Sequence, residues 1–389
     1  MRAKLYLKRN LRACVCALAV AVVALAVVAA PASALPARFW GVVPQATPSE
    51  EQFQRLRRGG VDSIRVPVSW AVLQPTRGGP INWAEVDGVV EKATKSGIEV
   101  LPFLSTAPTW AVPQATIPGT GGAKTVAHLP ATGASAAAWS SFVRQAVERY
   151  GPNGSFWATH PALPVRPIRS WQIWNEPNFK YFVAHPNPTE YGKLVKLSFT
   201  AIRAVDPGAQ VILAGLFAKP KGGRFLRPGK RHLVANPTSP NFFASYFVEQ
   251  MYQHNPGIKA RFTGVALHPY TPSYTYLTGE IEEFRKVLAA NHDSGKGLWI
   301  TELGWSSEPP NPSVNQFAKG PAGQASQLRG AFSLLERKQA KWRLQRVYWF
   351  SVDDQAGSCN FCDGSGLFGS GFKPKKAWYE FVKFAGGTP

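Results

Sequence analysis

The sequence predicts one α/β domain of the (β/α)8, or TIM, barrel class, with long loops on its C-terminal face. Eight short segments, apolar or β-branched and bounded by turn residues, have the pattern of strands buried in a sheet. Helix-like stretches lie between them, as is typical of a parallel sheet. Because the alternation runs eight times without a second cluster of strands, a closed barrel is favoured. An open doubly wound sheet is the alternative, but residues 41–50 lack the Gly-rich phosphate loop that such sheets usually carry after the first strand.

The predicted elements alternate along the chain. The first helix begins at Ser49, with Gln52 three residues later as in a capping box, and ends at Gly59 and Gly60. The second begins at Asn82, carries apolar residues at helical spacing and ends at Gly97. The strands are predicted at residues 39–43, 63–68, 98–104, 170–174, 210–215, 263–268, 298–303 and 346–351. The other helices are predicted at residues 138–151, 189–205, 242–253, 280–291, 323–338 and 376–385.

Two loops after predicted strands are long. Residues 105–133 follow the third strand and are rich in Pro and Gly, and residues 217–241 follow the fifth. In a barrel such loops lie on the C-terminal face, where active sites are built. The second loop is strongly basic and hints at an acidic or phosphate-bearing polysaccharide, although a neutral xylan or glucan is equally compatible with the sequence. Its basic residues are Lys219, Lys221, Arg224, Arg227, Lys230 and Arg231.

Residues 1–34 have the pattern of a secretory signal peptide, so the domain is expected to span residues 35–389. Five basic residues precede an apolar run at residues 13–30, and Ala32-Ser33-Ala34 supplies a small-residue cleavage site. The alternative is a retained membrane anchor, because the run is about long enough to span a bilayer. No second run of that length follows, so we expect a secreted, extracellular monomer without a stable membrane span after cleavage.

Charge and cysteine content narrow the choice of partners. Removing the five basic residues of the signal lowers the formal charge from +21 to +16. Such a protein could bind an anionic polysaccharide or cell wall, or could simply have a basic surface without a specific partner. No nucleic-acid-binding motif accompanies the charge, so nucleic acid is not expected as a partner. Cys359 and Cys362 remain after cleavage and are predicted to form a disulfide. A zinc ribbon would need a second pair of ligands, so we expect neither a metal nor another cofactor.

Two carboxylates each follow or end a predicted strand. Glu176 follows the fourth strand, and Glu302 ends the seventh in "WITELGW". In one barrel both would point into the same mouth, and a facing pair of carboxylates is what cleavage of a glycosidic bond requires. An apolar setting would raise the pKa of Glu176, whereas Arg65 and Tyr270 are plausible partners that would keep Glu302 ionised. A single Glu at a strand end is more often a helix cap or a salt bridge, and the pairing could be accidental.

Neighbouring residues favour the carboxylate pair. Asn175, His268 and Tyr270 follow strands, and Arg65 and Trp349 lie within them. With these residues the chain resembles the clan A glycoside hydrolases, retaining enzymes on a (β/α)8 barrel. The segments "WQIWNEPN" and "WITELGW" resemble the clan's fourth-strand and seventh-strand motifs. The segments "PNPTEYGKLV" and "VDPGAQVILAG" make family 39 the nearest resemblance, with family 5 next. Family 5 members commonly place a His after the third strand, where this chain has "FLSTAPTW".

The resemblance implies a role for each matched residue. It makes Glu176 the acid/base and Glu302 the nucleophile, with Asn175 bonded to the sugar 2-hydroxyl. It further implies that Tyr270 orients Glu302, that His268 shapes the same wall and that Arg65 supports the nucleophile from below. Trp349 becomes the stacking platform under the sugar. Independently of the resemblance, aromatic faces at a barrel mouth suit sugar rings, which adds Trp110 and Trp305.

These expectations describe a secreted retaining β-glycosidase that acts on a poly- or oligosaccharide by double displacement, without a cofactor. The first alternative is a catalytically silent barrel that binds carbohydrate or cell wall. The second is an adhesin for nucleic acid or cell wall that is driven by charge alone, whose binding would weaken steeply with salt. Retention requires the two carboxyls to lie about 5 to 5.5 Å apart, against about 6.5 to 9.5 Å for inversion.

Overall fold

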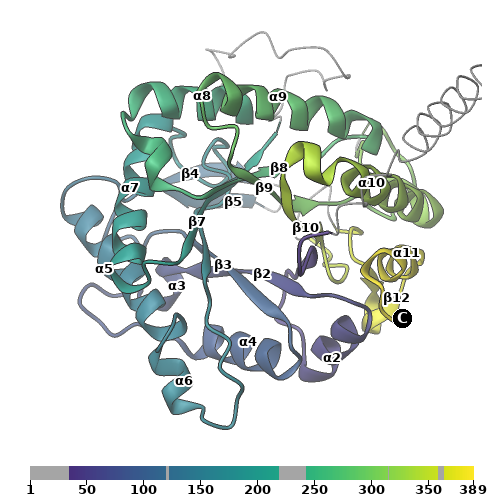
Figure 1. Cartoon of the computed structure of the whole chain (residues 1–389), viewed down its shortest axis with the longest axis horizontal. Helices are drawn as coiled ribbons and strands as arrows, with labels where there is room; N and C mark the ends of the chain where they lie inside the picture. The colour runs from purple at the N-terminus through teal and green to yellow at the C-terminus, as the bar shows by residue number, and fades with distance from the viewer. Residues whose placement is uncertain (1–34, 120–121, 219–241, 314, 358–362) are drawn as a thin grey trace, which may run out of the picture. The chain divides into compact units, whose positions relative to one another are not determined.

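The computed structural model describes residues 35–119, 122–218, 242–313, 315–357 and 363–389. Within the unit Pro36–Pro389, eight parallel strands close into a barrel in the order β1-β10-β9-β8-β7-β6-β3-β2 (Figure 1). These strands are β1 (Trp40–Val43), β2 (Ser63–Ser69), β3 (Glu99–Ser105), β6 (Ser170–Ile173), β7 (Gln210–Phe217), β8 (Gly264–His268), β9 (Gly297–Leu303) and β10 (Leu344–Phe350). The closed parallel barrel that the sequence predicts is therefore confirmed.

Helices surround the strands on the outside, as Figure 1 shows in a view along the barrel. They are α2 (Glu50–Arg58), α3 (Trp70–Leu73), α4 (Ala84–Lys95), α5 (Gly133–Tyr150), α6 (Ser155–Thr159), α7 (Pro188–Val205), α8 (Ala244–His254), α9 (Leu277–Ala290), α10 (Gly320–Trp342) and α11 (Lys376–Ala385). The predicted capping box is present: the Ser49 hydroxyl accepts from the Gln52 amide at 3.2 Å, and the Ser49 amide donates to Gln52 Oε1 at 2.8 Å. Within the ranges that the structure describes, no helix combines the length and hydropathy needed to cross a membrane.

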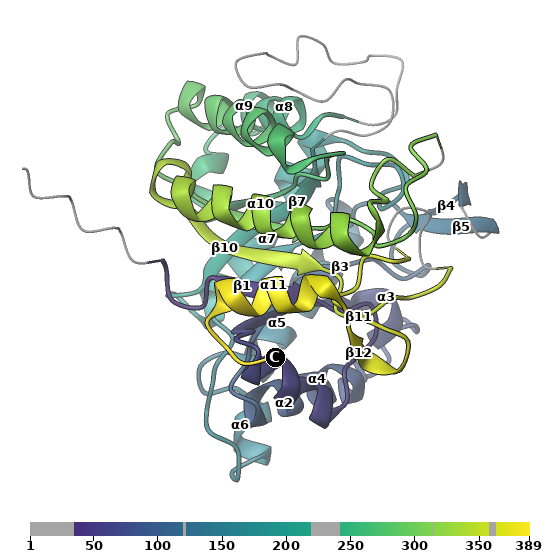
Figure 2. The same cartoon turned by 90° about the vertical axis from the view of Figure 1, so that its right-hand side faces the viewer.

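Two short pairs of strands that the sequence did not predict lie outside the barrel. Residues 105–133 contain an antiparallel hairpin of β4 (Gln114–Gly119) and β5 (Gly122–Ala127). Figure 2 shows this hairpin standing beyond the C-terminal ends of the barrel strands. A second small pair, β11 (Phe368–Gly369) with β12 (Lys373–Pro374), follows the last barrel strand. Pro118 and the glycines around the turn hid the short period-two pattern of the hairpin in the sequence.

The barrel interior changes from apolar to polar toward its C-terminal mouth. An apolar cluster fills the interior; its members are Val43, Leu101, Ile212, Ala266, Trp299 and Tyr348. Two residues further along their strands, Ala266 is followed by His268 and Trp299 by Thr301, and both of these polar residues are fully buried. Because side chains two apart share a face of a strand, this next layer faces the same interior. The strands thus present polar groups directly below the mouth.

Three predictions concern residues whose structure is not described. They are the signal peptide at residues 1–34, the disulfide between Cys359 and Cys362, and the subsite in the basic stretch at residues 219–231. Each lies outside the described residues and stays a prediction.

Candidate active site

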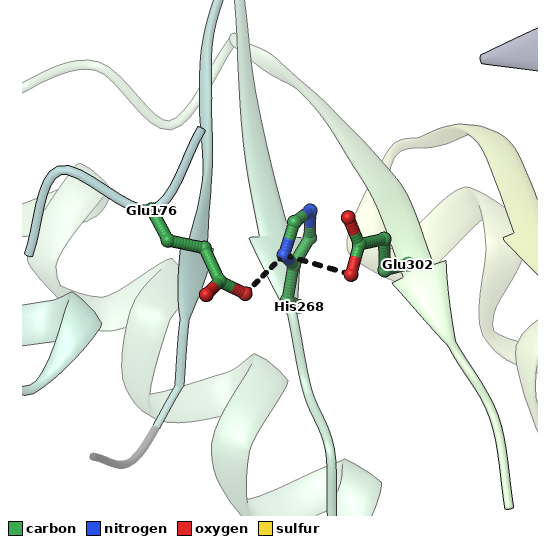
Figure 3. A group of neighbouring side chains, drawn as sticks. All are labelled: Glu176, His268 and Glu302. Atoms are coloured by element: carbon green, nitrogen blue, oxygen red, sulfur yellow. Dashed lines mark hydrogen bonds and ion pairs between the residues drawn. The ribbon is translucent and has the colours of Figure 1, made fainter. Parts of the chain in front are cut away.

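Glu176 and Glu302 meet at the C-terminal mouth of the barrel. Glu176 follows β6, Glu302 belongs to β9, and His268 at the end of β8 lies between the two carboxylates (Figure 3). One carboxylate oxygen of each Glu lies within 4.8 Å of the other. Both residues are buried, with exposed fractions of 4% and 9%. This proximity of the two nearest oxygens is compatible with the short spacing of about 5 to 5.5 Å between the carboxyl groups of a retaining pair.

The backbone after β6 turns Glu176 into the mouth. Trp174 and Glu176 both have positive φ, 70° and 43°, a conformation that is uncommon for residues other than Gly and is often found at active sites. The Glu176 amide donates to Gly215 O on β7 at 3.1 Å, which fixes the turn. Trp174 points the other way and packs on Trp139 of α5, with ring centroids 5.8 Å apart. Trp171 and Trp174 are at most 1% exposed, so they pack around the strand and do not line the mouth.

Arg65 holds the nucleophile candidate from below. Its guanidinium is fully buried and donates to Glu302 Oε1 at 2.6 Å and to Asn175 Oδ1 at 2.7 Å. A third donor, Nε, bonds Gln172 Oε1 at 2.6 Å. One rigid planar group therefore sets the positions of Glu302 and Asn175 together.

Tyr270 and His268 complete the setting of the two carboxylates. The Tyr270 hydroxyl donates to Glu302 Oε2 at 2.8 Å. His268 Nδ1 lies 2.6 Å from Glu176 Oε1 and 3.5 Å from Glu302 Oε2, and its Nε2 lies 3.0 Å from Thr301 Oγ1. Gly215 leaves room for this ring, because a Cβ there would lie 1.9 Å from His268 Nε2. The structure thus brings together six of the residues predicted from the sequence: Arg65, Asn175, Glu176, His268, Tyr270 and Glu302.

The two carboxyls have different electrostatic surroundings. Burial raises the pKa of Glu176 well above its ordinary value, and the negative charge of Glu302 raises it further against the opposing effects of Arg65 and Lys124. Burial also raises the pKa of Glu302, but Arg65 and the Tyr270 hydroxyl oppose that rise. Burial lowers the pKa of His268 well below its ordinary value, with Arg65 adding to the effect, so its imidazole is neutral. Glu302 is therefore the carboxyl that ionises first, and Glu176 keeps its proton to higher pH.

Substituting Glu302 with Gln should lower the pKa of Glu176, because the substitution removes the negative charge that raises it. Carbon-13 NMR titration of the Glu176 carboxyl measures this directly and needs no substrate. Glu91→Gln on α4 is the control, since its salt bridge to Lys95 is at the surface. An unchanged Glu176 titration in the Glu302→Gln protein would contradict the electrostatic coupling of the pair.

Glu176, His268 and Glu302 could also present ligand atoms to a metal ion. Both oxygens of Glu302 already accept hydrogen bonds, however, from Arg65 and Tyr270. A cation bound there would have to displace the guanidinium or lie directly beside its charge. The donor set therefore fits a carboxylate pair better than a metal centre.

The prediction of Trp349 as a stacking platform was wrong. Trp349 is fully buried, and its indole donates to Ser365 O at 3.0 Å while its ring contacts Phe332 of α10. Side chains alternate along β10, so Trp349 faces the helices while Tyr348 belongs to the interior cluster. Phe350 shares the inward face and is half-buried, with its ring centroid 6.3 Å from that of Tyr270. Phe350 is the aromatic residue that β10 offers to the mouth.

The other two predicted tryptophans have different outcomes. Trp305 is 1% exposed and donates to Thr271 O at 2.7 Å, so it has no free face for a sugar and the prediction was wrong. Trp110 is half-buried, donates to Gln74 O at 2.9 Å and packs edge-on against Trp70. Its contact with substrate stays a prediction.

Two residues that support the site, Gln172 and Asn178, were missed. Gln172 is fully buried and links Arg65 to Thr301, donating to Thr301 Oγ1 at 3.2 Å. Asn178 is also buried; its side-chain amide donates to Phe217 O and Phe242 O, both at 2.8 Å. The signal for Gln172 was a polar residue inside an apolar strand, which usually needs a buried partner. Asn178 is the last residue of the motif "WQIWNEPN", but its partners Phe217 and Phe242 are distant in the sequence, so its supporting role could not be predicted.

The closed barrel with two buried carboxylates at its mouth is the architecture that the resemblance to the clan A glycoside hydrolases implies. No family model matches the chain. A "Beta-xylosidase" of Geobacillus stearothermophilus is 27% identical over 178 residues, a match that covers 43% of this chain and 30% of that protein. The chain therefore matches less than a third of the length of this curated relative.

Solved structures extend the likeness over almost the whole chain. A family 39 glycoside hydrolase from Bacteroides cellulosilyticus WH2 matches with a TM-score of 0.61 and 18% identity, covering 90% of this chain and 64% of its own. A monomeric beta-xylosidase from Caulobacter crescentus CB15 matches with a TM-score of 0.58 and 18% identity, covering 90% and 68%. A family 10 endoxylanase from a sugarcane soil metagenome matches with a TM-score of 0.55 and 17% identity, covering 89% and 96%. The predicted resemblance to clan A, with family 39 among the matches, is confirmed, and at these identities it establishes the fold.

Proposed function

We propose that this chain is a retaining β-glycosidase, with Glu302 as nucleophile and Glu176 as acid/base. The observation that carries the proposal is a buried pair of carboxylates within 4.8 Å, of which one bonds a buried Arg and the other does not. An ionised nucleophile and a protonated acid are the two states that the first step needs.

In the first step Glu302 attacks the anomeric carbon and forms a glycosyl ester. The bond to the leaving oxygen breaks, and the proton of Glu176 moves to that oxygen. Tyr270 and Arg65 keep the carboxylate of Glu302 fixed for attack. Because Glu176 also bonds neutral His268, one of its oxygens is oriented while the other remains for the proton.

In the second step water hydrolyses the ester, and Glu176 takes the proton from that water. Esterification removes the negative charge of Glu302, which lowers the pKa of Glu176 just when it must act as a base. Asn175 supports both steps: its Oδ1 accepts from Arg65, which leaves its Nδ2 to donate to the sugar 2-hydroxyl beside Glu302.

The names of the matched proteins guide the choice of substrate. The curated relative is a "Beta-xylosidase", and the structural matches include β-xylosidases and xylanases. β-Xylosides are therefore the first substrates to test, followed by β-glucosides and β-mannosides.

We also propose that residues 1–34 direct export of the chain and are then removed, and that the exported protein is a monomer whose catalytic domain is residues 35–389. N-terminal sequencing of the protein from culture medium should begin at Leu35.

The stereochemistry of the first product tests this function. Proton NMR should follow hydrolysis of an aryl β-xyloside, or of the best aryl β-glycoside in a screen. The β-anomer of the free sugar should appear first and mutarotate later. An α-anomer as the first product would overturn the retaining mechanism. Hydrolysis of no glycoside at all would favour a carbohydrate-binding barrel.

A further inference from the structure

Lys124 lies on the β4–β5 hairpin, on the face that is turned toward the barrel loops. It shares a face of β5 with Val126, which is 5% exposed, while Ala123 and Thr125 on the other face are exposed. Lys124 itself is half-buried. A lysine that serves only for solubility would point outward on such a hairpin.

Aromatic rings surround the ammonium group of Lys124. Its Nζ lies 3.9 Å from the ring centroid of Tyr181 and 4.8 Å from that of Phe182. Among the described residues, no oxygen accepts a hydrogen bond from it and no carboxylate forms an ion pair with it. Aromatic faces attract a cation, but they accept no conventional hydrogen bond, so the N–H donors of the half-buried ammonium remain available to an anionic acceptor.

The hairpin is attached to the segment that directly follows Glu176. The Phe179 amide donates to Glu176 O at 2.9 Å, and the Phe182 amide donates to Phe179 O at 3.0 Å. The Ala184 amide then donates to Ala127 O at the end of β5, at 2.9 Å. Two successive turns thus carry the chain from Glu176 to the rings under Lys124.

Lys124 and Glu176 are electrostatic neighbours without a direct ion pair. The positive charge of Lys124 lowers the pKa of Glu176. Burial lowers the pKa of Lys124, and the charge of Glu176 opposes that change. Arg65 and Tyr270 bond Glu302 instead, so Lys124 belongs to the Glu176 side of the pair.

We propose that Lys124 belongs to a leaving-group subsite that binds a monoanionic substituent, a carboxylate or sulfate, on the sugar that departs. The inference rests on the proposed function, because Glu176 can only be beside the leaving group if it is the acid that protonates it. A half-buried ammonium without an acceptor gains most from an anion, and one lysine matches a single negative charge. The chain is thereby assigned acidic polysaccharides, such as uronate-bearing ones, as its substrate class.

Binding in a protein that does not turn over tests this directly. Calorimetry in the Glu302→Gln background should compare 4-carboxyphenyl, 4-sulfophenyl and neutral 4-carboxamidophenyl β-xylosides. We expect the two anionic probes to bind more tightly than the neutral one. Lys124→Met should reduce that preference by about tenfold to a hundredfold, the usual effect of a hydrogen bond to a charged group. Lys193→Met, which removes an exposed charge on α7, should leave the preference unchanged.

Failure of the proposed anion subsite can be distinguished from failure of the proposed glycosidase activity. An equal preference in the Lys124→Met and Lys193→Met proteins would overturn the subsite, even if the wild-type protein hydrolyses neutral xylosides. A preference that depends on Lys124, in a wild-type protein that hydrolyses no glycoside, would support the anion site and overturn the proposed function. Lys124→Arg should keep most of the preference, because it retains the charge; loss of preference there would contradict recognition by charge.

Discussion

Substituting Glu302 with Gln should reduce hydrolysis of every active substrate by about 10⁴-fold or more, the size of loss seen when a catalytic nucleophile is removed. Gln has nearly the shape of Glu, and its amide oxygen can still accept from Arg65, so the fold should persist. What is lost is the carboxylate that forms the glycosyl ester, and with it the covalent route. Initial rates on aryl glycosides and on polymers, together with circular dichroism, measure the two effects separately.

A smaller substitution at the same position adds a chemical readout. Glu302→Gly should open a space on the nucleophile's side of the sugar, where added azide can attack in its place. The product should be an α-glycosyl azide, because a single displacement inverts the anomeric carbon. Full hydrolytic activity in Glu302→Gln would contradict the assignment of Glu302, and a β-glycosyl azide from Glu302→Gly would place the nucleophile elsewhere.

Substituting Glu176 with Ala should produce a loss that depends on the leaving group. For glycosides with poor leaving groups, rates should fall by about 10²- to 10⁴-fold, since general acid catalysis is lost. Dinitrophenyl glycosides need no proton for departure, so their first step should be largely spared and the glycosyl-enzyme should accumulate. A burst of dinitrophenol in stopped-flow traces, followed by slow turnover, is the expected signature.

Azide distinguishes the two carboxylates. In Glu176→Ala it should accelerate the second step and yield a β-glycosyl azide, because it attacks the glycosyl-enzyme from the side that Glu176 occupied. The control is Glu85→Ala, which removes an exposed carboxylate on α4 and should leave the rates unchanged. An equal loss for good and poor leaving groups in Glu176→Ala would argue against an acid role.

The alternation of strands and helices could be predicted because each buried strand is a short apolar run between turn residues. All eight predicted strands are present, and the predicted ends of the last helix, residues 376–385, agree with α11. The hairpin in residues 105–133 could not be predicted in the same way, because its strands are only partly buried and are interrupted by Pro and Gly. Strands are recognised in a sequence by the pattern of apolar residues that burial imposes, and this pattern is weak in a hairpin that is only partly buried.

The pair of carboxylates could be predicted because parallel strands in a barrel end at one mouth. The residue of β10 that faces this mouth could not be predicted, because a shift of one residue moves a side chain to the opposite face of a strand. The choice of Trp349 over Phe350 was an error of this kind. The hydrogen bond from Gln172 to Thr301 joins residues that are 129 positions apart. It could not be predicted because neither strand's own sequence indicates how the two strands are aligned.

The proposed role of Glu302 in forming the covalent intermediate can be tested by labelling the protein with a mechanism-based inhibitor. The protein is incubated with the 2-deoxy-2-fluoro-β-glycosyl fluoride of the best sugar in the screen, whose fluorine slows hydrolysis of the glycosyl ester. Intact mass spectrometry should show one added glycosyl group, and peptide mapping should place it on Glu302 in the segment "WITELGW". A label on any other residue, or steady hydrolysis of substrate with no label at all, would contradict the account.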